Sequence, residues 1–77
     1  MSPKHPIFTS KEVIKAITQS GFKQISQKGS HIKYSKNDVG QQKRTVIIPL
    51  HETLSIGTLN SILDQAGLTI EELKKKL

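Results

Sequence analysis

The sequence predicts an α+β sandwich, in which two helices cover one face of a three-stranded antiparallel sheet and a short C-terminal helix follows. Two segments with apolar residues at helical spacing lie toward opposite ends of the chain. Between them, residues 22–48 hold three short strand-like stretches separated by turn residues. Strands joined by such short turns are expected to pair in antiparallel fashion. The predicted order along the chain is a helix, three strands and a second helix.

The first helix is expected over Ser10–Ser20. Thr9 and Glu12 have the spacing of a capping box at its start, and Gly21 suits the left-handed residue that often ends a helix. The apolar residues of this segment recur at helical spacing and predict one buried face: Val13, Ile14 and Ile17.

The three strands are expected at Phe22–Gln27, His31–Lys36 and Arg44–Ile48. Turn residues at 28–30 and 37–40 separate them, and Pro49 ends the third strand. Phe22 and Ile25 are three residues apart and have opposite parity. One of them is therefore expected to lie before the regular pairing of the first strand begins.

The second strand alternates polar and apolar residues, which is typical of a half-buried strand. Ile32 and Tyr34 are the apolar members and are expected to point into the core. Because the side chains of a strand alternate between its two faces, His31, Lys33 and Ser35 are expected to point outward together.

The C-terminal third predicts two more helices. Ser55 is expected to cap the longer one and Gly67 to end it. Its inner face is formed by residues at helical spacing: Leu59, Ile62, Leu63 and Ala66. Thr69 and Glu72 form a second capping box, which starts the short terminal helix. The whole order matches the double-stranded-RNA-binding type of sandwich, with one face of the sheet left open.

Composition favours one small domain. Leu, Ile, Val and Phe make up 22 of the 77 residues, which is enough for a compact core. We expect a single domain over residues 1–77, with residues 1–8 as an N-terminal arm and 9–77 as the folded unit. There is no cysteine for a disulfide or thiolate metal site. Without the apolar run of a signal peptide or membrane span, a cytoplasmic location away from membranes is expected.

The charge pattern favours a polyanionic partner. Twelve basic and six acidic residues give a net charge of +6. From Lys23 to Arg44 there are six basic residues and only one acidic residue, Asp38. A face of this kind suits nucleic acid, an anionic membrane surface or an acidic protein. It is also compatible with an ordinary solubilising surface.

His31 is the candidate catalytic residue of this basic region. An imidazole, whose ordinary pKa is about 6.5, can accept and return a proton near neutral pH. In RNA, removing the proton of a 2′-hydroxyl turns that group into an internal nucleophile beside the scissile phosphate. Lys28 and Lys33 are expected near His31, where they would offset charge on the phosphate. The Gly29-Ser30 turn would direct backbone N–H groups at the same anion.

Other chemistry is less well supported by the spacing. His51 is a possible second proton-transfer group, although a loop histidine is more often structural. No metal or other cofactor is expected, since the three histidines share no ligand spacing and no cysteine accompanies them. A triad of Ser30, His31 and Asp38 is disfavoured, because adjacent residues of a strand face opposite ways.

Four ordered stretches resemble the HicA toxins of bacterial toxin–antitoxin pairs. They are Gly21-Phe22-Lys23, Gln27-Lys28-Gly29-Ser30-His31, Ile48-Pro49-Leu50-His51 and Gly57-Thr58-Leu59-Asn60-Ser61-Ile62-Leu63-Asp64-Gln65-Ala66-Gly67-Leu68. The second is similar to the family's K-G-S-H segment and the fourth to its G-T-L-x-x-I-L-x-x-A-G-L segment. The chain departs from many members at Ile32, where a second histidine is common, at the turn 37–40 and at the acidic Asp64.

The resemblance implies the toxin of a type II pair, a metal-independent endoribonuclease that acts on mRNA. It implies a HicB-type antitoxin as partner, with the toxin monomeric alone and hetero-oligomeric when neutralised. The catalytic histidine of the family falls on His31. The remaining RNA-binding candidates come from the turn and the basic region: Lys28, Gly29, Ser30, Lys33, Lys36, Lys43 and Arg44.

Two alternatives use the same basic face. A non-catalytic RNA- or DNA-binding module would bind polyanions without needing His31. A protein-interaction domain would bind an acidic partner and never contact nucleic acid. Salt-sensitive binding alone does not separate the first alternative from the enzyme, since any set of phosphate contacts produces it.

Overall fold

The secondary structure follows the predicted order. The computed structural model describes residues 8–37, 43–50 and 53–77. Its elements are α1 (Ser10–Gln19), β1 (Lys23–Lys28), β2 (His31–Asn37), β3 (Lys43–Pro49), α2 (Ile56–Ala66) and α3 (Ile70–Lys75). The predicted bounds of the first helix and of all three strands are correct to within one residue. Residues 38–40 of the predicted second turn and 1–7 of the predicted arm lie outside the described part.

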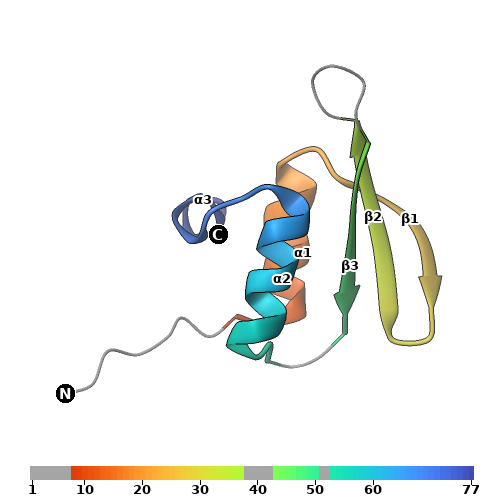
Figure 1. Ribbon diagram of the computed structural model, residues 1–77, viewed down its shortest axis with the longest axis horizontal. Helices are drawn as coiled ribbons and strands as arrows, with labels where there is room; N and C mark the ends of the chain where they lie inside the picture. Colours follow the sequence, from red (N-terminus) through yellow and green to blue (C-terminus); the bar gives the residue numbers. More distant parts are fainter. Residues whose placement is uncertain (1–7, 38–42, 51–52) are drawn as a thin grey trace.

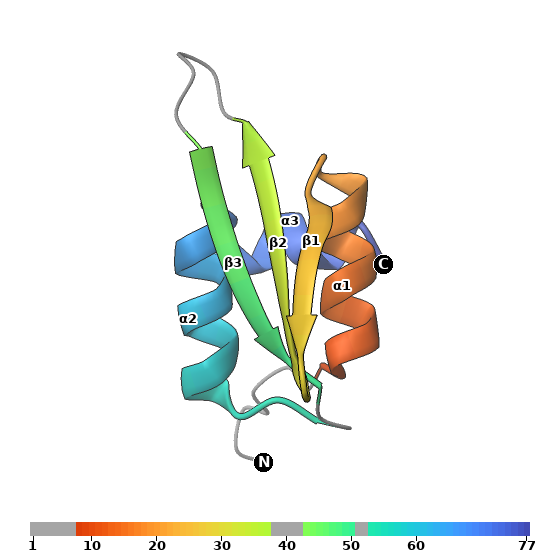
Figure 2. The same cartoon turned by 90° about the vertical axis from the view of Figure 1, so that its right-hand side faces the viewer.

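The strands form one antiparallel sheet in the order β1-β2-β3. Helices α1 and α2 lie on the same face of the sheet, and α3 packs against α1 (Figure 1). Viewed after a 90° turn, with the open face of the sheet toward the reader, the three strands lie in front of the helices (Figure 2). The open antiparallel sheet with helices on one face confirms the predicted α+β sandwich.

Side-chain caps fix where the helices begin. The Glu12 backbone N–H donates to Thr9 Oγ1 at 3.1 Å, and the Thr9 backbone N–H donates to Glu12 Oε1 at 2.9 Å. Thr69 and Glu72 repeat this arrangement at α3. Hydrogen bonds from the backbone N–H and the hydroxyl of Thr69 lower the pKa of the Glu72 carboxyl. Both predicted capping boxes are therefore confirmed, and each cap is worth about 1 kcal/mol.

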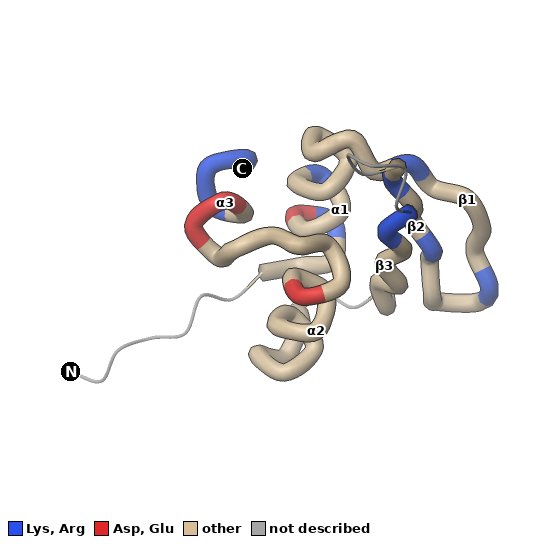
Figure 3. The backbone as a smooth tube through the Cα atoms, turned by 45° about the horizontal axis from the view of Figure 1, so that its top comes forward, with Lys and Arg blue, Asp and Glu red and all other residues tan. Residues whose placement is uncertain are grey.

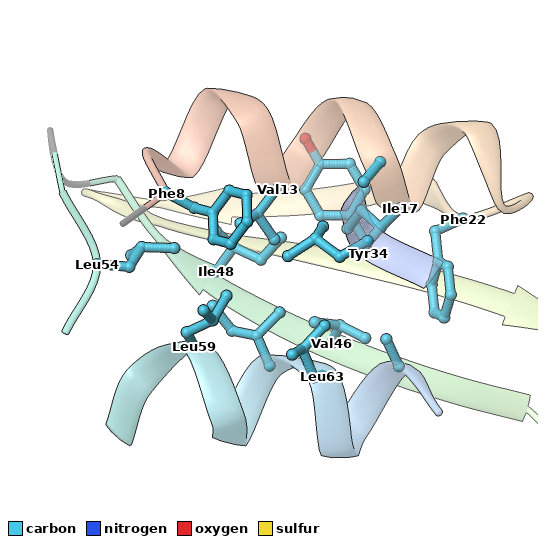
Figure 4. Close-up of a cluster of buried hydrophobic side chains, with 14 of the residues drawn as sticks. Phe8, Val13, Ile17, Phe22, Tyr34, Val46, Ile48, Leu54, Leu59 and Leu63 are labelled. Atoms are coloured by element: carbon cyan, nitrogen blue, oxygen red, sulfur yellow. The ribbon is translucent and has the colours of Figure 1, made fainter. Parts of the chain in front are cut away.

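The core lies between the sheet and the two long helices (Figure 4). The predicted inner face of α2 is buried, as are Val13 and Ile17 of α1 and Ile32 and Tyr34 of β2. Ile14, the third residue predicted for the inner face of α1, is only partly buried against the core. The largest side chains with almost no exposure come from every layer: Ile17, Ile48, Leu59, Ile62 and Leu73. Phe8 is buried at the start of α1 and belongs to the same cluster.

A β-bulge in β1 explains why Phe22 and Ile25 differ in burial. Phe22 precedes the strand and is buried, whereas Ile25 is 50% exposed. The register shifts between Gln24 and Ser26, so Ile25 is an extra residue on β1. The prediction that one of the two apolar residues lies before the regular pairing is confirmed for Phe22.

Pro49 is the last residue of β3, one residue beyond the predicted strand. The Ile47 backbone N–H points away from β2 and donates to Gln65 Oε1 on α2 at 3.2 Å. With a two-residue period, the nitrogen of Pro49 points the same way, so its missing N–H removes no bond to β2. The Leu50 N–H then donates to the Ser30 carbonyl at 2.6 Å and continues the pairing.

Stability should fall as the pH rises above about 10, the ordinary pKa of tyrosine, because burial raises the pKa of Tyr34. In that range the unfolded chain loses the phenolic proton and the folded chain keeps it, which favours unfolding. Urea denaturation from pH 8 to 11 should show a steeper loss of stability for the wild type than for Tyr34→Phe. Equal slopes would show that Tyr34 does not cause the loss of stability.

Candidate functional site

The open face of the sheet presents the residues that pair across the strands. Cross-strand partners in an antiparallel sheet share a face. Lys28 pairs with His31, and Lys33 pairs with Ser26 on one side and Ile47 on the other. Because Ile32 and Tyr34 are buried on the helix side, these pairs lie on the side away from the helices. The expected outward orientation of His31 and Lys33 is thus confirmed, whereas Ser35, which was expected to point outward with them, is buried, with 9% exposure.

A hollow in this face brings together the predicted catalytic residue and two of the predicted phosphate ligands. Its lining consists of Ser26, Lys28, His31, Lys33 and Ile47. The volume is about 550 Å³, within the range of ligand-binding clefts, and the hollow is open to solvent. Two ammonium groups, one imidazole, one hydroxyl and one apolar side chain therefore face the same space.

His31 follows directly from a tight hairpin turn. Lys28 and His31 are paired, so Gly29 and Ser30 form a two-residue connection between β1 and β2. Gly29 has a φ of +59°, the left-handed conformation that such turns require and that glycine adopts at little cost. The Gln27 side-chain amide donates to the Gly29 carbonyl at 3.1 Å and braces the turn. The His31 side chain is exposed, and no side chain in the described part pairs with its imidazole.

Charge is divided between the two layers of the sandwich. The strands carry six basic residues and no acidic ones, as their sequences KQISQK, HIKYSKN and KRTVIIP show. The acidic residues of the described part lie in the helices: Glu12, Asp64, Glu71 and Glu72. Figure 3 shows the red segments confined to the helices and blue segments along the sheet and also in α1 and α3. The strands are therefore the part of the described chain where positive charge is not offset by acidic residues, and the open face of the sheet is the surface that a polyanion would meet.

The remaining predicted RNA-binding residues lie away from the first hollow. Lys43 pairs with Asn37 at the opposite end of β2 from His31. Lys36 and Arg44 are paired with each other and have the parity of the buried residues. The Arg44 guanidinium lies over Gly67 at the end of α2, where an added Cβ would come within 2.8 Å of it. Arg44 thus points toward the helix layer and does not share a face with His31.

Two lining residues of the hollow were not among the predicted site residues. Ile47 is 44% exposed, whereas its neighbour Ile48 is fully buried. The alternation in the β-branched run of β3 could have identified Ile47 as the outward residue. Ser26 had no such signal, because its orientation depends on the bulge at Ile25.

Other predicted candidates cannot be located in the same way. His51 and Asp38 lie outside the described residues. Within the ranges 8–37, 43–50 and 53–77, no three His, Asp or Glu side chains are grouped so that they would hold a metal ion. In the same ranges, no helix has the length and apolar character needed to cross a membrane.

Fold and site together define a small α+β protein with a cationic open sheet and a solvent-facing histidine. The family model described as the HicA toxin of bacterial toxin–antitoxin systems matches residues 10–68, most of the chain. The chain therefore belongs to the HicA toxin family and is the toxin component of a toxin–antitoxin system. A search of curated proteins finds no significant match.

Proposed function

We propose that this toxin is an endoribonuclease that cleaves mRNA without a metal ion, with His31 as the general acid/base. The observation that carries the proposal is the open hollow in which an exposed imidazole faces two lysines. Membership of the HicA family supports the biological setting, which is that of a toxin in a toxin–antitoxin system.

The chemistry is a transfer within the RNA. The His31 imidazole removes the proton of a ribose 2′-hydroxyl, and the 2′-oxygen forms a bond to the adjacent phosphorus. The bond between phosphorus and the 5′-oxygen breaks, and that oxygen takes a proton from solvent, to which the hollow is open. The products are a 2′,3′-cyclic phosphate and a 5′-hydroxyl. The imidazolium then releases its proton to solvent, which restores the enzyme.

Lys28 and Lys33 supply the electrostatic part. Lys28 is the cross-strand neighbour of His31, and Lys33 lies two residues farther along the same face of β2. Negative charge accumulates on the phosphate oxygens as the new bond forms, and ammonium groups beside it lower that barrier. The N–H groups of the Gly29-Ser30 turn are the second set of donors proposed for this anion.

A HicB-type antitoxin is the proposed inhibitor. The open sheet face combines cationic residues with the exposed side chain of Ile47. An antitoxin with an acidic and partly apolar surface would cover both and exclude RNA. On this proposal the toxin is monomeric alone, assembles with the antitoxin into a hetero-oligomer and acts in the cytoplasm.

The role of the 2′-hydroxyl gives a direct test of the mechanism. Purified protein in EDTA should cleave an RNA strand and should bind, but not cleave, a fully 2′-O-methylated strand of the same sequence. The RNA products should carry cyclic phosphate ends, which mass spectrometry distinguishes from linear ones.

The possible failures separate the alternatives. Cleavage only after a divalent metal is restored would contradict the metal-free mechanism, and cleavage of the methylated strand would exclude the 2′-oxygen as nucleophile. Binding of both strands with no cleavage of either would favour a non-catalytic RNA-binding module. Binding of neither strand would favour a domain that recognises an acidic protein.

A further inference from the structure

A second hollow lies toward the other end of β2, where the chain enters β1. It is lined by Gly21, Lys23, Ile25, Ser35, Lys36 and Asn37. Its chemistry repeats that of the first hollow, with two lysines, polar hydrogen-bonding groups and one exposed isoleucine. It lacks an imidazole, so it has the means to bind a phosphate and a sugar or base but no group suited to proton transfer at neutral pH.

The bulge in β1 brings one lysine of each hollow onto the same face. Lys23 and Lys28 are five residues apart, so a regular strand would direct them to opposite faces. The extra residue Ile25 reverses the alternation between them. Lys23 therefore pairs with Ser35 on the open face, as Lys28 pairs with His31.

Contacts hold the second lysine of this hollow in place. The Lys36 ammonium lies 5.6 Å from the centroid of the Phe22 ring, within the range of a cation–π contact. Its aliphatic stem passes over Gly21, at 3.6 Å from the position a Cβ would take there. In the described part, no carboxylate pairs with Lys36 or Lys23. A restrained lysine without an acidic partner loses less entropy when it binds an anion.

The two hollows are neighbours along β1 and β2. Lys23 and Ser35 of the second hollow have the facing of His31 and Lys33, whereas Lys36 has the opposite parity and lines this hollow from the side of Phe22. Ser35 lies two residues beyond Lys33 on β2, a separation of about 7 Å along the strand. The whole strand from His31 to Asn37 spans about 20 Å. The strands carry no acidic residue that would interrupt this path. An extended polyanion seated at His31 can therefore continue into the second hollow.

We propose that the second hollow is a phosphate-binding subsite for the same RNA strand whose scissile phosphate lies at His31. Lys23 and Lys36 bind a phosphate remote from the cleavage point, and Ile25 packs against the attached nucleotide. The proposal rests on the nuclease function proposed above and adds to it the path of the strand. Because the subsite contacts the strand away from the reacting atoms, it contributes to substrate binding and not to the chemical step.

The test replaces both lysines by methionine, which keeps most of the apolar stem and removes the charge. Lys23→Met/Lys36→Met should raise the KM for RNA about 10- to 100-fold and leave kcat unchanged. Its binding to the 2′-O-methylated strand should depend less on salt, with a log–log slope smaller by about 1.4, or about 0.7 per lost contact. Lys11→Met/Lys15→Met, in which both lost charges are on the exposed surface of α1, is the charge-matched control and should leave both values near those of the wild type.

The two readouts distinguish a failed subsite from a failed nuclease. If the wild type cleaves RNA but the double variant keeps its KM and salt slope, the subsite proposal is wrong. The subsite proposal is also wrong if the double variant loses affinity only for the antitoxin, because the hollow would then belong to the interface between toxin and antitoxin. If the wild type does not cleave, a salt slope that is smaller in Lys23→Met/Lys36→Met and unchanged in Lys11→Met/Lys15→Met still supports the subsite. Only the proposed nuclease function is then contradicted.

Discussion

Replacing His31 by alanine should lower the rate of RNA cleavage by about 100- to 10,000-fold, the range usually lost with a general base. The side chain is exposed and has no partner in the described part of the chain, so its removal leaves no cavity and no unpaired buried group. Circular dichroism and the melting temperature should therefore match those of the wild type. Cleavage in EDTA, followed by gel electrophoresis, measures the effect.

Added imidazole provides the control for a chemical rather than a structural role. The hollow at His31 is open, so free imidazole can enter the space left by the alanine and should restore part of the activity. Thr45→Ala, which alters an exposed residue elsewhere in β3, should cleave at the wild-type rate. Equal cleavage by the wild type and His31→Ala would remove this residue from the mechanism and would indicate a contaminating nuclease.

Adjacent isoleucines of β3 should differ sharply in their effect on stability. Ile48→Ala should lower the free energy of unfolding by about 2–5 kcal/mol, because the side chain is fully buried between the sheet and both long helices (Figure 4). Ile47 is 44% exposed on the opposite face, so Ile47→Ala should cost under about 1 kcal/mol. A loss at the upper end would consume much of the stability of a small domain.

Urea denaturation of the two variants under the same conditions measures this difference. The residues share a strand, a residue type and a substitution, so strand propensity cancels in the comparison. A similar loss in both variants would mean that the two faces of β3 are equally buried in solution. This would contradict the open face on which the candidate site depends.

Much of this fold follows from local patterns in the sequence. Thr9 and Glu12 mark the start of α1 because their reciprocal hydrogen bonds need only backbone spacing. The alternation around Ile32 and Tyr34 likewise predicts which side of β2 is buried, because the side chains of a strand alternate with a fixed period of two residues. Pro49 ends the third strand as predicted. Its inclusion as the last paired residue could not be predicted, because the orientation of its nitrogen depends on the pairing with β2.

The candidate site was harder to predict than the fold. The pairing of Lys28 with His31 follows from the short Gly29-Ser30 turn, and the outward direction of Lys33 follows from strand periodicity. The separation of Arg44 from that surface could not be seen from charge alone. The alternation of β3 does indicate it, because Arg44 has the same parity as the buried Val46 and Ile48.

The bulge also bears on which changes the family can tolerate during evolution. Ile25 is exposed, so the sheet itself places little demand on the identity of the side chain there. Loss of the whole residue would leave Lys23 and Lys28 four residues apart in a regular strand, and an even spacing again places both lysines on one face. The arrangement that would turn one lysine toward the helices is a strand that keeps all its residues and loses the bulge. Relatives that share the cationic surface should therefore have either a five-residue spacing with a bulge or a four-residue spacing without one, whatever the intervening residues are.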